Sequence, residues 1–280
     1  MHINMKKSLV LISLFFLSCF TLEAKEYKSL ELPRIQVVPI QDSQSGGQYE
    51  LYIKLPESYS KDNGKEYPVI YTTDAMWHIE ILSGSAEFVI ENAILVGVSW
   101  QKDMEDEHEF ASRFQDYTFI ESKTSKYKRG QADNHITFIR NDVINYVESN
   151  YQVDPDNNTY FGYSLGGAFG AYILLTQPDI FKNYILGSPA FGEKSLKYIN
   201  DITPTSVLKQ KKENTNVFIS YGELETELGK KAEKFVAKLK NSHYPNFLLK
   251  QEVIKSSDHG RAFPMTAVSS MYWLSDVDNN

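Results

Sequence analysis

The chain has 280 residues, of which 42% are hydrophobic and 23% are charged, and its formal net charge at pH 7 is -7. This ordinary globular composition excludes a low-complexity chain, and the acidic balance argues against nucleic acid as a partner, because nucleic acid requires a basic surface. The length is sufficient for one sizeable α/β domain with a filled core.

The N-terminal segment has the pattern of a secretory signal peptide. Lys6 and Lys7 precede an apolar stretch of about 14 residues, and a small residue, Ala24, follows it. Spanning a bilayer takes about 20 apolar residues, so we favour a signal over a membrane anchor. We therefore expect residues 1–24 to be removed and residues 25–280 to form a single domain. That domain would be periplasmic or secreted, without stable membrane insertion.

Cys19 supplies a second interpretation of the same segment. The pair Ser18-Cys19 has a weak similarity to a lipoprotein signal, which would leave the chain anchored at Cys19. Cys19 is also the only cysteine of the sequence. Cleavage after Ala24 would therefore leave a chain without disulfides, a cysteine nucleophile or thiolate metal ligands.

Short β-type runs recur along the rest of the chain, and about eight strands are expected. They cover residues 36–40, 49–55, 68–73, 93–99, 159–163, 183–188, 217–221 and 248–254. Several, such as PVIYTT and VFISY, are almost continuously apolar, which is typical of parallel strands buried on both faces. The first two runs have no helix between them and predict an antiparallel N-terminal edge.

Helical periodicity falls between the later runs. One apolar face comprises Ile136, Ile139, Val143 and Val147, and a second lies in the segment that follows Gly229. Alternating strands and helices predict an α/β fold, with a mostly parallel sheet flanked by helices. The long charged segment 101–134 has weak periodicity, and we expect it to be a loop that folds over the functional site.

A G-x-S-x-G motif lies where a predicted strand meets a predicted helix, with Ser164 between Gly162 and Gly166. Such an elbow holds its serine in a strained turn, so that Oγ projects at the top of the sheet. The chain turns so tightly that side chains two residues either side of the serine would collide, and glycine removes the collision. The helix that follows directs free N–H groups at any developing anion. Ser164 is thus a candidate nucleophile.

A serine nucleophile of this kind needs an acid and then a histidine further along the chain. His259 follows the last predicted strand, and no other histidine follows a strand downstream of a candidate acid. The strand VFISY ends in Gly222, after which Glu225 is the favoured acid, while Glu223, Glu227 and Asp258 stay open. Both groups follow carboxyl ends of strands, where α/β sheets place their sites.

Two backbone N–H groups are expected to bind the oxyanion. One belongs to the residue after the nucleophile, here Leu165, and the other to the loop after the third strand, where the chain reads DAMW from Asp74 to Trp77.

From about residue 49 onward the chain resembles the Putative esterase family of α/β-hydrolases. That family includes S-formylglutathione hydrolases, trilactone siderophore esterases and mycolyltransferases. The shared features are the Y-P-V-x-Y-x-x-D run at 67–74, the R-x-x-D segment at 113–116, the elbow at 162–167, Ser188-Pro189, the G-x-x-E segment at 222–225 and His259. The resemblance implies an α/β-hydrolase fold and assigns the second oxyanion N–H to Met76. This chain departs from the pattern at Ala75, where the family has glycine, and at Phe191, where many relatives have tryptophan.

These features predict an exported serine esterase with a Ser-His-Glu triad, no metal and no organic cofactor. The expected substrate is a small-molecule carboxylic ester, with siderophore and aryl esters as candidates. An acyltransferase of the same fold, a catalytically silent binding module and a peptidase are the alternatives. Product analysis with an alcohol acceptor would separate the first, and covalent labelling by a fluorophosphonate the second.

Four further residues are candidates for substrate binding. Trp77, Tyr163 and Phe191 each neighbour a predicted catalytic element and could pack a flat group, or they could simply fill the core. Arg113 could contact an anionic part of the substrate, or it could tie down the long loop through Asp116.

Overall fold

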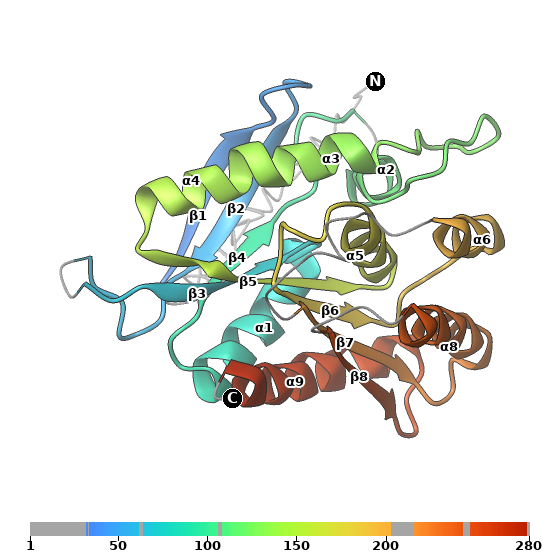
Figure 1. Cartoon of the computed structure of the whole chain (residues 1–280). Coiled ribbons are helices and arrows are strands. Elements are labelled where there is room, and N and C mark those ends of the chain that lie inside the picture. Colours follow the sequence, from blue (N-terminus) through green and yellow to red (C-terminus); the bar gives the residue numbers. More distant parts are fainter. Residues whose placement is uncertain are drawn as a thin grey trace, which may run out of the picture. The chain divides into compact units, whose positions relative to one another are not determined.

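An eight-stranded sheet forms the centre of the computed structural model (Figure 1). The structure describes residues 32, 34–61, 64–105, 108–202, 215–242 and 247–278, so the predicted signal segment and Cys19 lie outside the described residues. The strands are β1 (Ile35–Gln41), β2 (Gln48–Lys54), β3 (Tyr67–Thr72), β4 (Ile94–Val98), β5 (Val153–Tyr163), β6 (Asn183–Gly187), β7 (Thr215–Gly222) and β8 (Phe247–Ile254). Their order in the sheet is β1-β2-β4-β3-β5-β6-β7-β8.

The pairing confirms the predicted mostly parallel sheet with an antiparallel N-terminal edge. β1 pairs antiparallel with β2, and β2 antiparallel with β4, whereas β4, β3, β5, β6, β7 and β8 pair in parallel. Because the carboxyl ends of parallel strands lie at one edge of a sheet, the segments after β3, β4, β5, β6, β7 and β8 converge there.

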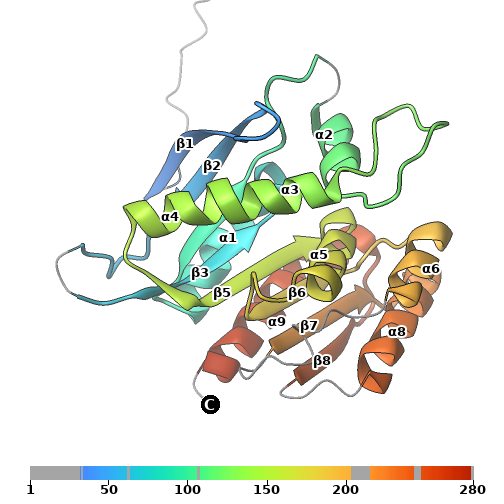
Figure 2. The same ribbon diagram turned by 45° about the horizontal axis from the view of Figure 1, so that its top comes forward.

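Helices cover both faces of the sheet (Figures 1 and 2). One face carries α1 (Ala75–Val89) and α9 (His259–Asp278), which pack against each other. The other face carries α3 (Ala132–Phe138), η1 (Ile139–Ile144), α4 (Asn145–Asn150), α5 (Leu165–Thr176), α6 (Glu193–Asp201) and α8 (Thr226–Asn241). Together, α3, η1 and α4 form one continuous helical segment, whose middle part is a π-helix.

The core consists of two apolar clusters, one on each face of the sheet, as the alternation of side chains along a strand requires. On β3, for example, Val69 and Tyr71 belong to the cluster under α5, whereas Ile70 belongs to the cluster under α1 and α9. The four apolar residues predicted to share a helical face, 136, 139, 143 and 147, are all buried in the first cluster. The predicted apolar face is therefore the buried face of this helix.

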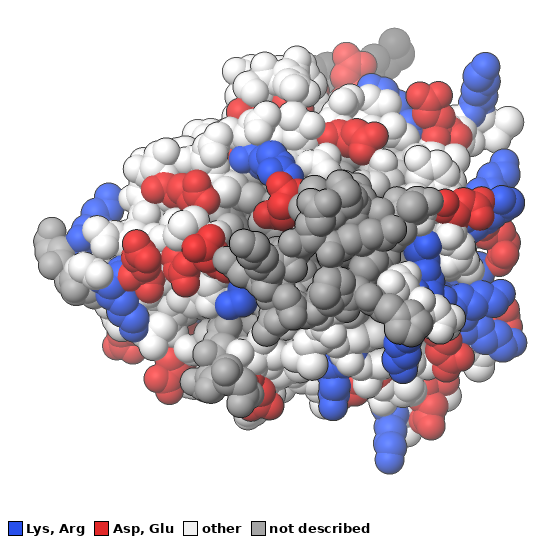
Figure 3. All heavy atoms as spheres, in the orientation of Figure 1, with Lys and Arg blue, Asp and Glu red and all other residues white. Residues whose placement is uncertain are grey.

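The charged segment 101–134 differs from the predicted loop, because it contains the helix α2 (His108–Asp116). This helix packs against α3. None of the helices described here is both long and apolar enough to span a membrane. On the face shown in Figure 3, acidic and basic side chains of the described residues are interspersed.

Candidate active site

Ser164 lies in a sharp turn between β5 and α5, in a backbone conformation that L-residues rarely adopt (φ 58°, ψ -117°). Its N–H donates to the Gly187 carbonyl at 2.9 Å, which ties the turn to β6. A Cβ atom at Gly162 would lie 2.4 Å from the Gly166 carbonyl oxygen, and one at Gly166 would lie 2.5 Å from Thr73 Oγ1. Glycine is thus required at both positions, although the clashes it avoids involve backbone and Thr73 rather than two side chains of the motif. Such strain is typical of a nucleophile elbow.

Glu225 and His259 meet at the same edge of the sheet. Glu225 follows β7 and precedes α8, while His259 is the first residue of α9, just beyond β8. Glu225 Oε1 lies 2.5 Å from His259 Nδ1. Its other oxygen, Oε2, accepts hydrogen bonds from Ser188 Oγ at 2.7 Å and from the Gly222 N–H at 2.6 Å. The carboxylate is therefore held from both sides and can orient the imidazole.

The other candidate acids lie elsewhere. The carboxylate of Glu223 accepts from the Ser256 N–H at 2.8 Å. Glu227 pairs with a lysine of its own helix, and Asp258 accepts from a backbone N–H in the first turn of α9. Of the four acids left open by the sequence, Glu225 has the contact with His259.

The environment of Glu225 favours its ionised form. The side chain is only 6% exposed, and burial by itself would raise its pKa. The hydrogen bonds from His259, the Gly222 N–H and Ser188 outweigh that effect, so the pKa of Glu225 lies below its ordinary value. The residue is consequently an anion at neutral pH, as a group that stabilises an imidazolium must be.

Ser164 and His259 line one cavity of about 400 Å³. Its walls are largely aromatic, and the lining residues are Trp77, His78, Arg113, Tyr163, Ser164, His259, Gly260 and Phe263. The volume is within the range of small-molecule sites, which is about 300–1,000 Å³. Within the described parts of the chain, no group of three acidic, histidine or cysteine side chains is placed to hold a metal ion.

Two helix N-termini flank the elbow. Leu165 is the first residue of α5 and Met76 the second residue of α1, so neither N–H has an acceptor within its own helix. The two turns are neighbours, since the Cβ position of Gly166 would lie 3.6 Å from Asp74 Oδ2. Ala75 begins α1, and the residue with a left-handed backbone is Asp74 (φ 55°). The glycine expected from the family pattern is therefore not required at position 75.

Arg113 is paired with Asp74 rather than with Asp116. Its Nε donates to Asp74 Oδ1 at 2.7 Å and a terminal nitrogen to Oδ2 at 3.1 Å. The Asp74 side chain is fully buried and that of Arg113 is 12% exposed. Trp100 Nε1 also donates to Asp74, and the guanidinium lies over the ring of Trp77 at 4.7 Å. The alternative in which Arg113 ties down its segment through Asp116 is therefore wrong, because the partner of Arg113 is Asp74. Through this ion pair Arg113 braces the turn that carries Met76.

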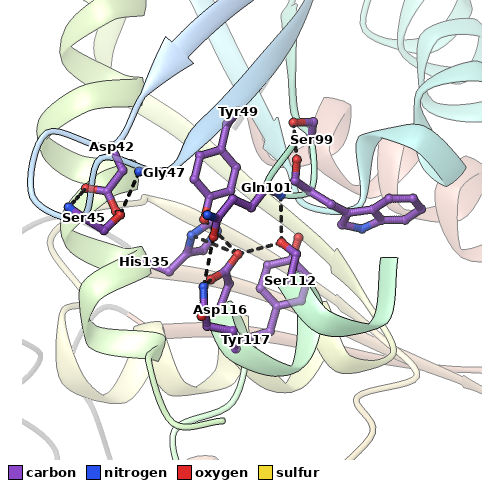
Figure 4. A network of polar contacts seen from close by, with 12 residues as sticks. Asp42, Ser45, Gly47, Tyr49, Ser99, Gln101, Ser112, Asp116, Tyr117 and His135 are labelled. Atoms are coloured by element: carbon purple, nitrogen blue, oxygen red, sulfur yellow. Dashed lines mark hydrogen bonds and ion pairs between the residues drawn. The ribbon is translucent and has the colours of Figure 1, made fainter. Parts of the chain in front are cut away.

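Asp116, the last residue of α2, instead belongs to a buried network of polar contacts (Figure 4). It accepts hydrogen bonds from Tyr49 of β2 at 3.0 Å and from Ser112 at 2.8 Å, and it lies near His135 of α3. Burial lowers the pKa of His135, so this histidine is neutral at pH 7. The network joins α2 to the sheet and to α3, and in this way it fixes the helix that presents Arg113 to the cavity.

The predicted aromatic residues divide between the cavity and the core. Trp77 and Tyr163 line the cavity. The hydroxyl of Tyr163 donates to the His259 carbonyl at 2.5 Å, which holds the start of α9. Phe191 is 4% exposed and packs against Phe235 of α8, 5.5 Å between ring centroids. Phe191 is not among the residues that line the cavity, and its packing fits the alternative that it fills the core.

Two residues of the site had no role in the sequence-based hypothesis. Ser188 donates a hydrogen bond to Glu225, and His78 lines the cavity beside Ser164. The Ser-Pro pair at the end of a predicted strand was a signal for the first. No comparable sequence motif marked the second, whose ring nitrogen Nδ1 contacts the Thr73 carbonyl.

Comparison with known proteins places the chain in a family. A family model described as Putative esterase matches residues 43–274. The chain is similar to the ferri-bacillibactin esterase BesA of Bacillus subtilis (strain 168), at 29% identity over 214 residues, which cover 69% of this chain and 72% of that protein.

Solved structures agree with this family. The crystal structure of the BES protein from Bacillus cereus has a TM-score of 0.76 at 25% identity, covering 89% of this chain and 97% of that one. An IroE-like serine hydrolase from Shewanella oneidensis shares the fold, with a TM-score of 0.73 at 16% identity over 86% of this chain and 80% of that one. The chain therefore belongs to the Putative esterase family of α/β-hydrolases, whose members act on ester bonds.

Proposed function

We propose that this chain is an exported serine esterase that hydrolyses carboxylic esters through an acyl-enzyme intermediate. Ser164 is the nucleophile, His259 the general base and acid, and Glu225 the acid that orients the histidine. The observation that carries the proposal is the 2.5 Å contact between Glu225 Oε1 and His259 Nδ1, at a cavity that Ser164 also lines.

The proposed reaction follows from the contact between Glu225 and His259. Because the Glu225 carboxylate can only accept, His259 carries its proton on Nδ1 and leaves Nε2 free to accept the proton of Ser164 Oγ. Oγ attacks the ester carbonyl, and the N–H groups of Leu165 and Met76 stabilise the oxyanion. A donor of this kind usually contributes about 10²–10³ in rate. The alcohol leaves with the proton from His259, and water, activated by the same histidine, releases the acid.

The proposed substrate class is a siderophore or aryl ester. One similar protein is named for its action on ferri-bacillibactin, which supports an iron-chelator ester. Trp77, Tyr163 and Phe263 give the cavity flat apolar walls that suit an aromatic group.

Export is proposed from the sequence of residues 1–24 alone. The positive start, the apolar stretch and Ala24 support it. A periplasmic or secreted enzyme would meet chelators outside the cytoplasm, whereas anchoring through Cys19 would place the same enzyme at a membrane surface.

The test is a substrate panel on the purified chain, comprising p-nitrophenyl esters, feruloyl esters and catecholate trilactones. We expect hydrolysis of at least one aryl or trilactone ester, with the free acid as product even when an alcohol acceptor is present. Transfer of the acyl group to the alcohol as the main product would identify an acyltransferase instead.

A further inference from the structure

His78 lines the cavity beside Ser164 and His259, yet the proposed reaction does not use it. It is the fourth residue of α1, directly after the turn that carries Met76. The residue is 4% exposed, so the ring is almost enclosed by the protein apart from the cavity. A polar group in such a position is either a structural anchor or a contact for the substrate.

One ring nitrogen of His78 is already engaged. Nδ1 lies 2.9 Å from the carbonyl oxygen of Thr73. A carbonyl oxygen can only accept, so the proton of this hydrogen bond belongs to Nδ1. Burial lowers the pKa of His78 more strongly than Asp74 and the Thr73 carbonyl raise it, so the ring is neutral at pH 7. The proton on Nδ1 therefore leaves Nε2 with a lone pair, as a hydrogen-bond acceptor.

Nε2 of His78 is open to a ligand. Within the described residues it has no hydrogen-bond partner. Among the described residues, Nε2 of His135 is fully buried and has no hydrogen-bond partner. Nε2 of His78 does not belong to this group of fully buried atoms. Because the residue is buried but lines the cavity, the cavity is the place where Nε2 can find a partner.

Aromatic neighbours fix the orientation of this acceptor. Phe263 stacks on the His78 ring at 4.6 Å between centroids, and Phe161 and Tyr163 meet it edge-on at 6.1 Å and 6.4 Å. A ring packed on several sides and tied through Nδ1 cannot turn freely. The acceptor is thus preorganised among apolar walls, where an unpaired polar group is costly once a ligand excludes water.

We propose that His78 determines specificity, with Nε2 accepting a hydrogen bond from a hydroxyl or amide N–H carried by the flat part of the ester. The proposal rests on the proposed esterase function and narrows its substrate class to esters that bear such a donor. An ester that buries an ether oxygen or a methyl group against Nε2 leaves the acceptor unsatisfied and is disfavoured.

The experiment compares aryl esters that carry a free hydroxyl, one for each ring position, with their O-methyl ethers. We expect the wild type to prefer at least one hydroxylated ester over its ether by roughly tenfold in kcat/KM. His78→Asn keeps a side-chain N–H near the position of Nδ1 for the Thr73 carbonyl but removes the cavity acceptor. His78→Gln instead places an amide oxygen near the position of Nε2. The preference should disappear in His78→Asn and persist in His78→Gln.

The opposite ranking, with the preference kept in His78→Asn and lost in His78→Gln, would show that His78 is a structural anchor. Equal hydrolysis of both members of every pair by the wild type would also overturn the inference while leaving the esterase function intact, and this comparison needs no variant. A wild type that hydrolyses no ester would instead refute the proposed function and the inference together. Melting temperatures of both variants separate loss of folding from loss of recognition.

Discussion

Replacing Glu225 by glutamine tests how the acid acts, because the structure fixes which way the new amide must face. Glu225 Oε2 accepts from the Gly222 N–H at 2.6 Å, and this backbone donor cannot reorient. The glutamine carbonyl will therefore stay with Gly222 and turn its NH₂ group toward His259 Nδ1. A donor there stabilises the tautomer that carries the proton on Nε2, and that tautomer cannot accept the proton of Ser164.

The expected loss in kcat for Glu225→Gln is about 10⁴, the size seen when a triad acid loses its charge and imposes the wrong tautomer. The assay is hydrolysis of a p-nitrophenyl ester at neutral pH, with melting temperature as a check on folding. Glu223→Gln is the matched control, since Glu223 contacts the Ser256 N–H and not the histidine. Glu225→Gln activity within tenfold of the wild type, or a larger loss in Glu223→Gln, would show that Glu225 is not the acid that orients His259.

Three further predictions follow from the same contacts. Ser188→Ala removes one donor to Glu225 and should lower kcat about tenfold with KM unchanged, so a change confined to KM would contradict it. Arg113→Ala removes the cationic partner of buried Asp74 and should lower the free energy of unfolding in urea by about 3 kcal/mol. It should also reduce kcat/KM equally for anionic and neutral esters, whereas a selective loss on anionic esters would indicate substrate recognition. Finally, the pKa of Glu225 in the folded state lies below its ordinary value. Ionised Glu225 therefore contributes its full stabilisation at a pH above the ordinary pKa. This stabilisation is lost as the pH falls through the lower pKa of the folded state. The melting-temperature advantage of the wild type over Glu225→Gln should shrink on acidification, and growth of that advantage would contradict the assignment.

The sheet could be predicted from the sequence because most of its strands appear there as short runs rich in apolar residues. β5 begins earlier than predicted, at Val153, because residues 154–157 that follow it are polar or proline and are partly or fully exposed. α2 was missed because it is short and most of its residues are charged or polar, which leaves only Phe110, Ala111 and Phe114 as apolar positions. What holds α2 in place is the contact of Tyr49 with Asp116, between residues far apart in the chain, which no local pattern reveals.

The meeting of Glu225 and His259 could be anticipated because each follows a buried strand, and β7 and β8 prove to be neighbours in the sheet. The partner of Arg113 could not, since Asp74 belongs to a different segment. Phe191 shows the same limit, because nearness in sequence to the strand that ends at Gly187 does not determine which way a side chain points. Its ring packs on α8, away from the cavity.

Ser164 is tested as the nucleophile most directly by covalent labelling of the purified chain with a fluorophosphonate, followed by peptide mapping in a mass spectrometer. We expect one adduct, on Ser164, which forms in the wild type and is absent from a folded Ser164→Ala variant. No adduct on the active wild-type enzyme, or an adduct on another residue that persists in Ser164→Ala, would contradict the claim that Ser164 is the nucleophile.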